Sequence, residues 1–86
     1  MRIDKYLKVS RLIIRRTIAN ELCNNGKVLI NNKIAKPSTE VKENDVITLI
    51  LGNKKITTKV LKLLPYAKKK DADDMYQIIS SDEIKS

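Results

Sequence analysis

The spacing of the apolar residues changes at Gly26, and this change restricts the chain to a mixed fold. Before Gly26, apolar residues recur every three or four positions, which predicts two short amphipathic helices over about residues 3–10 and 16–25. Gly26 ends the second helix as a left-handed cap. After it, short runs rich in β-branched residues predict strands. We therefore expect an α+β fold in which two or three short N-terminal helices pack on a small, mostly antiparallel sheet.

Five short segments after Gly26 are candidates for these strands: residues 28–30, 33–35, 46–51, 56–63 and 75–79. Asn31-Asn32 predicts a tight turn because asparagine tolerates positive φ, and residues 52–55 predict a hairpin connection. We expect one domain over residues 1–65. Residues 66–86 then form a C-terminal extension that docks through 75–79 and is frayed from residue 80.

The chain is too small for a typical enzyme and lacks the usual catalytic residues. It has 86 residues, no histidine and a single cysteine, Cys23. A chain of this length has no room for a catalytic module beside a binding module. We expect no catalytic residue, no metal and no cofactor, and we interpret Cys23 as a small buried residue. Neither a membrane span nor a signal peptide is predicted, so we expect a cytoplasmic protein without membrane association.

The formal charge of +8 is unevenly distributed along the chain. Residues 1–16 carry six basic residues against one acid, residues 17–65 carry eight against four, and residues 66–86 carry four against five. All four arginines fall in the first stretch, and the planar arginine fork binds phosphate better than lysine does. Arg15 and Arg16 also stand at the start of the second helix, where backbone N–H groups favour anions. The candidate RNA-binding residues are Arg2, Lys5, Lys8, Arg11, Arg15 and Arg16.

Four other residues have simpler interpretations. Asp4 is expected to act through the helix dipole or as an ion-pair partner that holds the basic face, because no second acid lies near it in the sequence. Tyr6 is expected in the core, while Lys54 and Lys55 are expected to face solvent at a hairpin tip. With three tyrosines as the only aromatic residues, structured RNA bound through its backbone fits better than base stacking.

Several motifs together resemble the S-four RNA-binding domain. They are Arg2-Ile3-Asp4-Lys5-Tyr6-Leu7, Arg15-Arg16-Thr17-Ile18-Ala19, Asn25-Gly26-Lys27-Val28, Ile30-Asn31-Asn32-Lys33 and Val41-Lys42-Glu43-Asn44-Asp45. This resemblance covers about residues 1–51. Residues 9–13 and Met75-Tyr76 also resemble the stand-alone bacterial ribosome quality control members of that family, which extends the likeness over nearly the whole chain.

The resemblance implies a monomeric RNA-binding factor with three partners. These are the ribosomal RNA of the large subunit, the peptidyl-tRNA left on a stalled and split ribosome, and a quality-control protein that adds alanine to the nascent chain. By position, Arg2 and Arg16 are the leading RNA-contact residues, followed by Lys5, Arg11 and Arg15. Two positions depart from the family pattern: Arg15 stands where a serine or threonine often caps the helix, and Asn44 stands where glycine is usual.

Other functions stay open at this point. A related heat-shock protein of the same domain family also handles stalled large subunits, although it typically has a longer basic C-terminal extension. Two short basic helices also fit a small DNA-binding helix-turn-helix protein. The same domain occurs as an accessory of RNA-modifying enzymes and tRNA synthetases, and a basic surface could dock on an acidic protein.

Overall fold

The computed structural model describes residues 1–83 of the chain. These residues form three helices and five strands, in the order α1 (Ile3–Val9), α2 (Arg16–Asn24), β1 (Val28–Ile30), β2 (Lys33–Ile34), β3 (Val46–Leu51), β4 (Lys54–Val60), α3 (Lys69–Ala72) and β5 (Tyr76–Glu83). The strands make one sheet in the order β2-β1-β3-β4-β5, and every neighbouring pair is antiparallel. The predicted α+β fold is confirmed.

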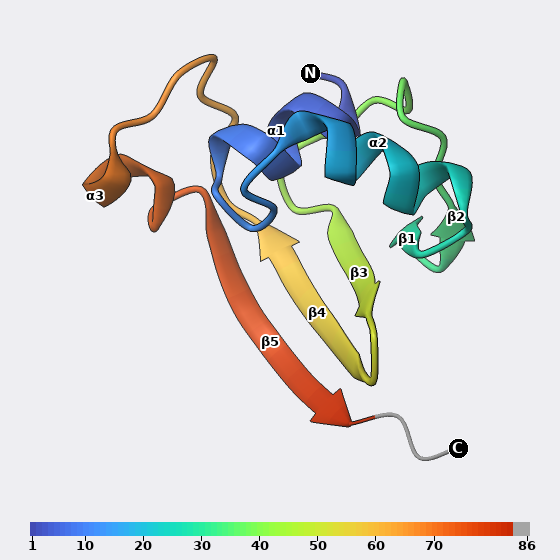
Figure 1. Cartoon of the computed structure of the whole chain (residues 1–86). Coiled ribbons are helices and arrows are strands. Elements are labelled where there is room, and N and C mark those ends of the chain that lie inside the picture. The colour runs from blue at the N-terminus through green and yellow to red at the C-terminus, as the bar shows by residue number, and fades with distance from the viewer. Residues whose placement is uncertain (84–86) are drawn as a thin grey trace.

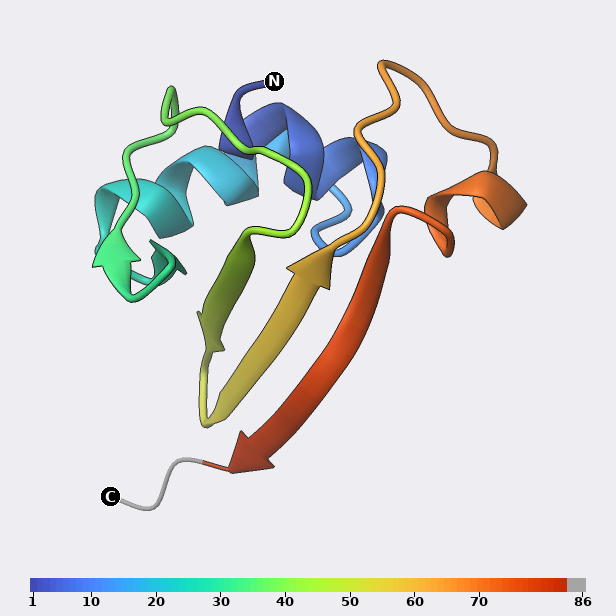
Figure 2. The same ribbon diagram turned by 180° about the vertical axis from the view of Figure 1, so that it is seen from behind.

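The two N-terminal helices, α1 and α2, lie across one end of the sheet, and the β3–β4 turn lies at the opposite end (Figures 1 and 2). The core fills the space between the helices and the sheet. Its largest fully buried side chains include Ile3, Tyr6 and Leu7 from α1 together with Ile47 and Leu49 from β3. The helices therefore cover the core with one face and expose the other face to solvent.

The turns predicted from glycine and asparagine have the expected backbone. Gly26 has φ 70°, and Asn31 and Asn32 have φ 51° and 69° between β1 and β2. Asn44 also has a positive φ, of 73°, so asparagine replaces glycine there at low cost. The two predicted helices are confirmed to within one residue at each end. These features depend on local geometry, which a short stretch of sequence determines.

The predicted limits of β3 are confirmed, but those of the turn after it and of β4 are wrong. Leu51 pairs with Lys54, so the connection is the two-residue turn Gly52-Asn53, and β4 begins two residues earlier than expected. At the other end, β4 stops at Val60 instead of Leu63. The apolar residues that follow include Leu63 and Leu64, which pack on the core from a loop. These buried residues extend the apolar run of the sequence beyond the strand, although they do not pair in the sheet. Lys54 and Lys55 are exposed as expected, but they belong to the strand.

The C-terminal strand is longer than predicted. We expected residues 75–79 to dock and the chain to fray from Ser80, whereas β5 runs from Tyr76 to Glu83 and pairs with β4 throughout. A bulge between the two strands shifts the alternation, and Glu83 and Asp82 lie opposite Lys54 and Lys55. Because these paired residues are polar, the spacing of apolar residues did not predict this part of the strand. Residues 84–86 lie outside the described part, and the domain boundary at 65/66 stays a prediction.

Candidate nucleic-acid interface

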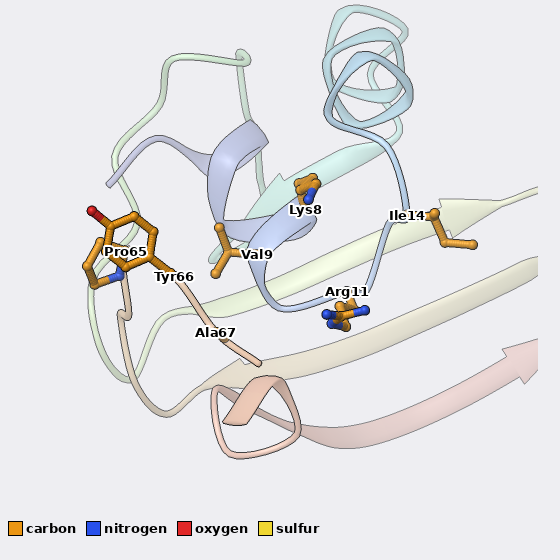
Figure 3. Close-up of a pocket in the computed structure, with 7 residues that line it drawn as sticks. All are labelled: Lys8, Val9, Arg11, Ile14, Pro65, Tyr66 and Ala67. Atoms are coloured by element: carbon orange, nitrogen blue, oxygen red, sulfur yellow. The ribbon is translucent and has the colours of Figure 1, made fainter. Parts of the chain in front are cut away.

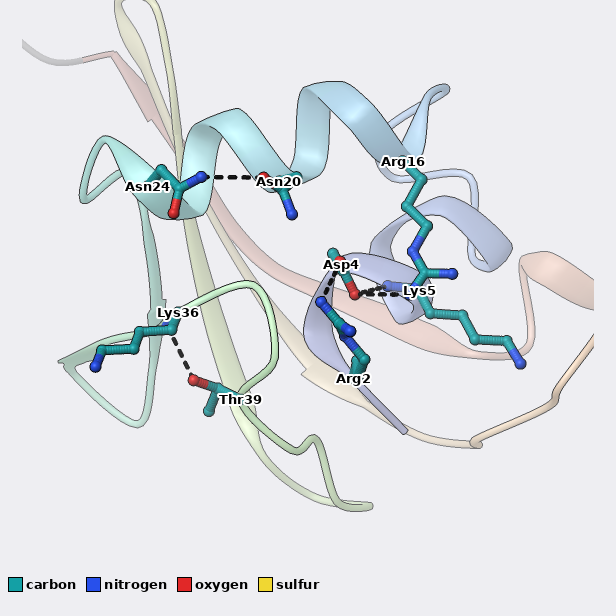
Figure 4. Close-up of polar contacts among 8 residues, drawn as sticks. All are labelled: Arg2, Asp4, Lys5, Arg16, Asn20, Asn24, Lys36 and Thr39. Carbon is teal, nitrogen blue, oxygen red and sulfur yellow. Dashed lines mark hydrogen bonds and ion pairs between the residues drawn. The ribbon is translucent and has the colours of Figure 1, made fainter.

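A buried carboxylate joins two arginines that lie 14 positions apart in the sequence. Arg2 Nη2 lies 3.1 Å from Asp4 Oδ2, and Arg16 Nη2 lies 3.3 Å from Asp4 Oδ1. The backbone N–H of Lys5 donates to the same Oδ1 at 2.8 Å. The Asp4 side chain is 3% exposed, whereas those of Arg2 and Arg16 are 51% and 48% exposed. The carboxylate therefore fixes two guanidinium groups that still face solvent (Figure 4).

Asp4 stays ionised despite its burial. Burial raises the pKa of this carboxyl, but the hydrogen bond and charge of Arg16, the charge of Arg2 and the Lys5 N–H bond outweigh it, so the pKa lies below its ordinary value of 3.8. The expectation that Asp4 is an ion-pair partner is confirmed. One negative charge between two positive ones leaves a net positive surface.

The start of the chain is held in place by backbone contacts. Arg2 forms a β-bridge with Glu40, and the N–H of Ile3 donates to the Thr39 carbonyl at 2.8 Å. The terminal amine of Met1 lies 3.5 Å from a Glu40 carboxylate oxygen. Arg2 is therefore positioned by its backbone as well as by Asp4.

The six predicted RNA-binding residues divide into separate groups. Arg2 and Arg16 gather around Asp4, and Lys5 contacts it through its backbone N–H while its side chain extends away (Figure 4). Lys8 and Arg11 instead line a groove at the C-terminal end of α1. Arg15 is exposed at the N-cap of α2 and makes no side-chain cap hydrogen bond, as its chemistry predicts. We call the first group, together with Asp4, the arginine cluster.

The sequence analysis missed a groove beside the arginine cluster. This groove of about 710 Å³ is lined by Arg2, by Asn20 and Asn24 of α2, and by residues 34–38, which include Lys36. Asn24 Nδ2 donates to Asn20 Oδ1 at 3.0 Å, and the Lys36 N–H donates to the Thr39 hydroxyl at 2.9 Å (Figure 4). The i, i+4 spacing of the two asparagines signals a shared helix face, but their closeness to Lys36 follows only from the tertiary fold.

Arg11 has an unusual backbone that the sequence did not signal. Its φ is 64°, and it ends α1 in the left-handed region that glycine usually occupies. Its N–H donates to the Lys8 carbonyl at 3.1 Å, and the N–H of Ile13 donates to the Leu7 carbonyl at 3.0 Å. A side chain in this conformation costs about 1 kcal/mol relative to glycine.

The two remaining reactive side chains near the cluster serve packing. Burial, followed by the nearby charge of Asp4, raises the pKa of the Cys23 thiol to about 11, so the thiolate is scarce at neutral pH. Tyr6 is fully buried, and its hydroxyl donates to the Met75 carbonyl at 2.8 Å. Both packing interpretations are confirmed. Within residues 1–83, every helix is too short or too polar to cross a bilayer.

The chain is similar to known proteins over nearly its whole length. The S4 domain family matches residues 1–47. The RQC P-site tRNA stabilizing factor of Streptococcus pneumoniae is 48% identical over 98% of this chain and 96% of its own length. The protein of the same name from Bacillus subtilis is 44% identical, covering 98% of each chain.

A solved structure has the same fold. The trimeric structure of Vibrio cholerae Heat Shock Protein 15 aligns with a TM-score of 0.85 and 30% identity, over 93% of this chain and 82% of that one. The matches therefore include both the basic helical end and the C-terminal strand. The chain belongs to the S4-domain family of RQC P-site tRNA stabilizing factors.

Proposed function

We propose that this protein is a non-catalytic RNA-binding factor that stabilises tRNA in the P site during ribosome quality control. The arginine cluster is the observation that carries this proposal, because two half-exposed guanidinium groups are held by one buried carboxylate. Such planar forks bind phosphate oxygens through two hydrogen bonds. The name of the relatives and the S4 domain match support the same conclusion.

The proposed partners are large-subunit ribosomal RNA and the peptidyl-tRNA of a stalled, split ribosome. Bound there, the factor would hold the tRNA while a second protein extends the nascent chain with alanine. We further propose that it acts as a cytoplasmic monomer. Binding through phosphates and shape suits this task, because a stabilising factor needs a fixed orientation on the RNA and no base sequence.

Preorganisation explains how so small a surface could bind firmly. A free arginine side chain loses rotamer freedom when it binds, whereas Arg2 and Arg16 are already held by Asp4. Asn20, Asn24 and Lys36 extend the surface along the neighbouring groove with additional hydrogen-bonding groups. The RNA backbone would therefore contact the arginine cluster and continue along α2.

The direct test compares Arg16→Ala and Arg16→Lys in binding to purified large ribosomal subunits that carry tRNA. We expect Arg16→Ala to weaken binding about tenfold, and Arg16→Lys to recover part of the loss because it keeps the charge without the fork. Lys55→Ala removes the same charge at the start of β4 and serves as the control. Equal affinities for Arg16→Ala and the control would contradict the proposal.

A second experiment tests the finer role. The tagged protein is recovered from cells with stalled ribosomes, and the bound RNA is identified. Large subunits with peptidyl-tRNA are expected, together with loss of alanine tails when the protein is deleted. Recovery of intact ribosomes, or of duplex DNA in preference to structured RNA, would contradict the quality-control role.

A further inference from the structure

A second groove lies at the opposite end of α1 from the arginine cluster. It has a volume of about 370 Å³ and is lined by Lys8, Val9, Arg11, Ile14, Pro65, Tyr66 and Ala67. The α1–α2 connection forms one side, and the segment between β4 and α3 forms the other (Figure 3). We call it the tyrosine groove.

The tyrosine groove combines an exposed aromatic ring with positive charge. Tyr66 is 86% exposed and Ile14 is 83% exposed, so neither is packed in the fold. Figure 3 shows these two side chains at the two ends of the groove, with Lys8, Val9 and Arg11 between them. Within the described residues, the lining includes no acid. Cations flanked by exposed apolar side chains fit a ligand with a flat apolar face and a negative charge.

Tyr66 is available for stacking in a way that the other two tyrosines are not. Tyr6 is fully buried and donates its hydroxyl to Met75, and Tyr76 is partly buried in β5. That a chain with so few aromatic residues does not bind an extended strand by base stacking stays a prediction, but one exposed ring is enough for a single base.

Arg11 adds an independent observation. Its left-handed backbone would be less strained with glycine, yet the position carries an arginine whose side chain reaches into the groove. Strained backbone in proteins concentrates at functional sites. Binding of a ligand by the guanidinium group would explain why an arginine, and not a glycine, occupies this strained position.

We propose that the tyrosine groove binds one unpaired nucleotide of the RNA, with the base stacked on Tyr66 and its phosphate bound by Lys8 and Arg11. This inference rests on the proposed RNA-binding function and assigns it a second contact. Lys5 and Lys8 lie one turn apart on α1, and the seven-residue helix is about 10 Å long, so a short run of RNA backbone can reach both surfaces. An acidic protein segment is the competing occupant, and the charged lining next to an RNA surface favours the nucleotide.

The test compares Tyr66→Leu with Tyr66→Phe in binding to purified large ribosomal subunits that carry tRNA. Leucine keeps an apolar side chain but loses the ring, and we expect it to weaken binding about tenfold, because aromatic stacking on a base is specific to the ring. Tyr66→Phe should bind as tightly as the native protein. Neither change removes a charge, so the dependence of affinity on salt should not change. Ultraviolet crosslinking of the native complex should attach a nucleotide to Tyr66.

Three outcomes would overturn the inference. Native affinity of Tyr66→Leu without a crosslink at Tyr66 would exclude stacking. Native RNA affinity combined with lost alanine tailing would assign the groove to a protein partner. Equal losses in Tyr66→Leu and Tyr66→Phe would show that the hydroxyl, and not the ring, matters. Arg2→Ala/Arg16→Ala, measured in parallel, separates the two proposals: if it binds weakly while Tyr66→Leu binds normally, only the stacking inference fails.

Discussion

The two ends of the molecule both carry exposed positive charge, but they arrange it differently. At the helical end, Arg2 and Arg16 share the buried carboxylate of Asp4 and point their remaining donors to solvent. At the far end of the sheet, Lys54 and Lys55 lie opposite Glu83 and Asp82 across the β4–β5 pair. The first arrangement fixes a net positive surface, and the second balances each lysine with an acid. The two ends therefore differ in how charge is held, and the number of basic residues alone does not distinguish them.

The largest expected difference between the two ends is in RNA affinity. Arg2→Ala/Arg16→Ala should weaken binding to large subunits about a hundredfold, because each charge-assisted contact contributes about 1.5–3 kcal/mol. Lys54→Ala/Lys55→Ala removes the same charge and should weaken binding less than about threefold. Filter binding at fixed salt measures both, and circular dichroism verifies folding. Adding Asp4→Asn to the arginine variant removes the buried charge that would otherwise be left unpaired. Similar losses at both ends would contradict the comparison.

The next effect concerns stability against acid. Asp4→Asn should lower the free energy of unfolding by about 1–2 kcal/mol at neutral pH, since it weakens hydrogen bonds to a buried charge. The folded pKa of Asp4 lies below 3.8, so the unfolded chain takes up the proton first, and the native protein loses this stability as the pH falls below 3.8. The two proteins should therefore converge in acid urea titrations. Asp82→Asn at the other end is the control, and a constant gap down to low pH would exclude this role for Asp4.

A smaller effect tests whether the two ends share one core. Tyr6 of α1 donates its hydroxyl to the carbonyl of Met75, just before β5. Tyr6→Phe should lower the free energy of unfolding by about 1 kcal/mol, because it removes one buried hydrogen bond, while the Met75 carbonyl keeps the bond from the Leu61 N–H at 2.8 Å. Tyr66→Phe, on an exposed ring, should have no measurable effect. Urea denaturation compares the two, and equal stability would mean that the Tyr6 bond contributes nothing.

The smallest effect separates charge from strain at Arg11. Arg11→Gly should raise the free energy of unfolding by about 0.5–1 kcal/mol, since glycine adopts a φ of 64° without strain. The same change should weaken RNA binding several-fold because a cation is lost. Arg11→Ala removes the guanidinium but keeps the strain, so it should lose affinity without gaining stability. A stability gain in both variants would show that strain is not the cause.

The sequence predicts the elements up to β3 well and those after β3 poorly. Gly26 and Asn31-Asn32 give strong local signals, and the helices before them end within one residue of the expected positions. Strand β5 was expected to stop at residue 79, because residues 80–83 are polar and are held by pairing with β4. Leu63 and Leu64 caused the opposite error. They were assigned to a strand because they are apolar, but they lie in a loop that packs on the core.

For the candidate site, the sequence identified the basic residues but not their grouping. Arg2 and Arg16 were the leading residues, and Asp4 was expected to pair with basic neighbours. That Lys8 and Arg11 line a separate groove with Tyr66 depends on where the segment after β4 returns to the helices. Asn20, Asn24 and Lys36 were missed because nothing in the sequence distinguishes them. They form one surface only because the loop after β2 lies beside α2.

The sequence by itself determined the class of fold, the helix ends, the tight turns and the concentration of arginine near the N-terminus. Each depends on a few neighbouring residues, through helical periodicity, positive φ or local charge. The tertiary structure alone decided that one buried carboxylate orients two arginines, that β5 extends to Glu83 and that Tyr66 and Arg11 line the same groove. The physical reason is that burial, ion pairing and strand pairing join residues far apart in the chain, so their effect exists only once the core has brought them together.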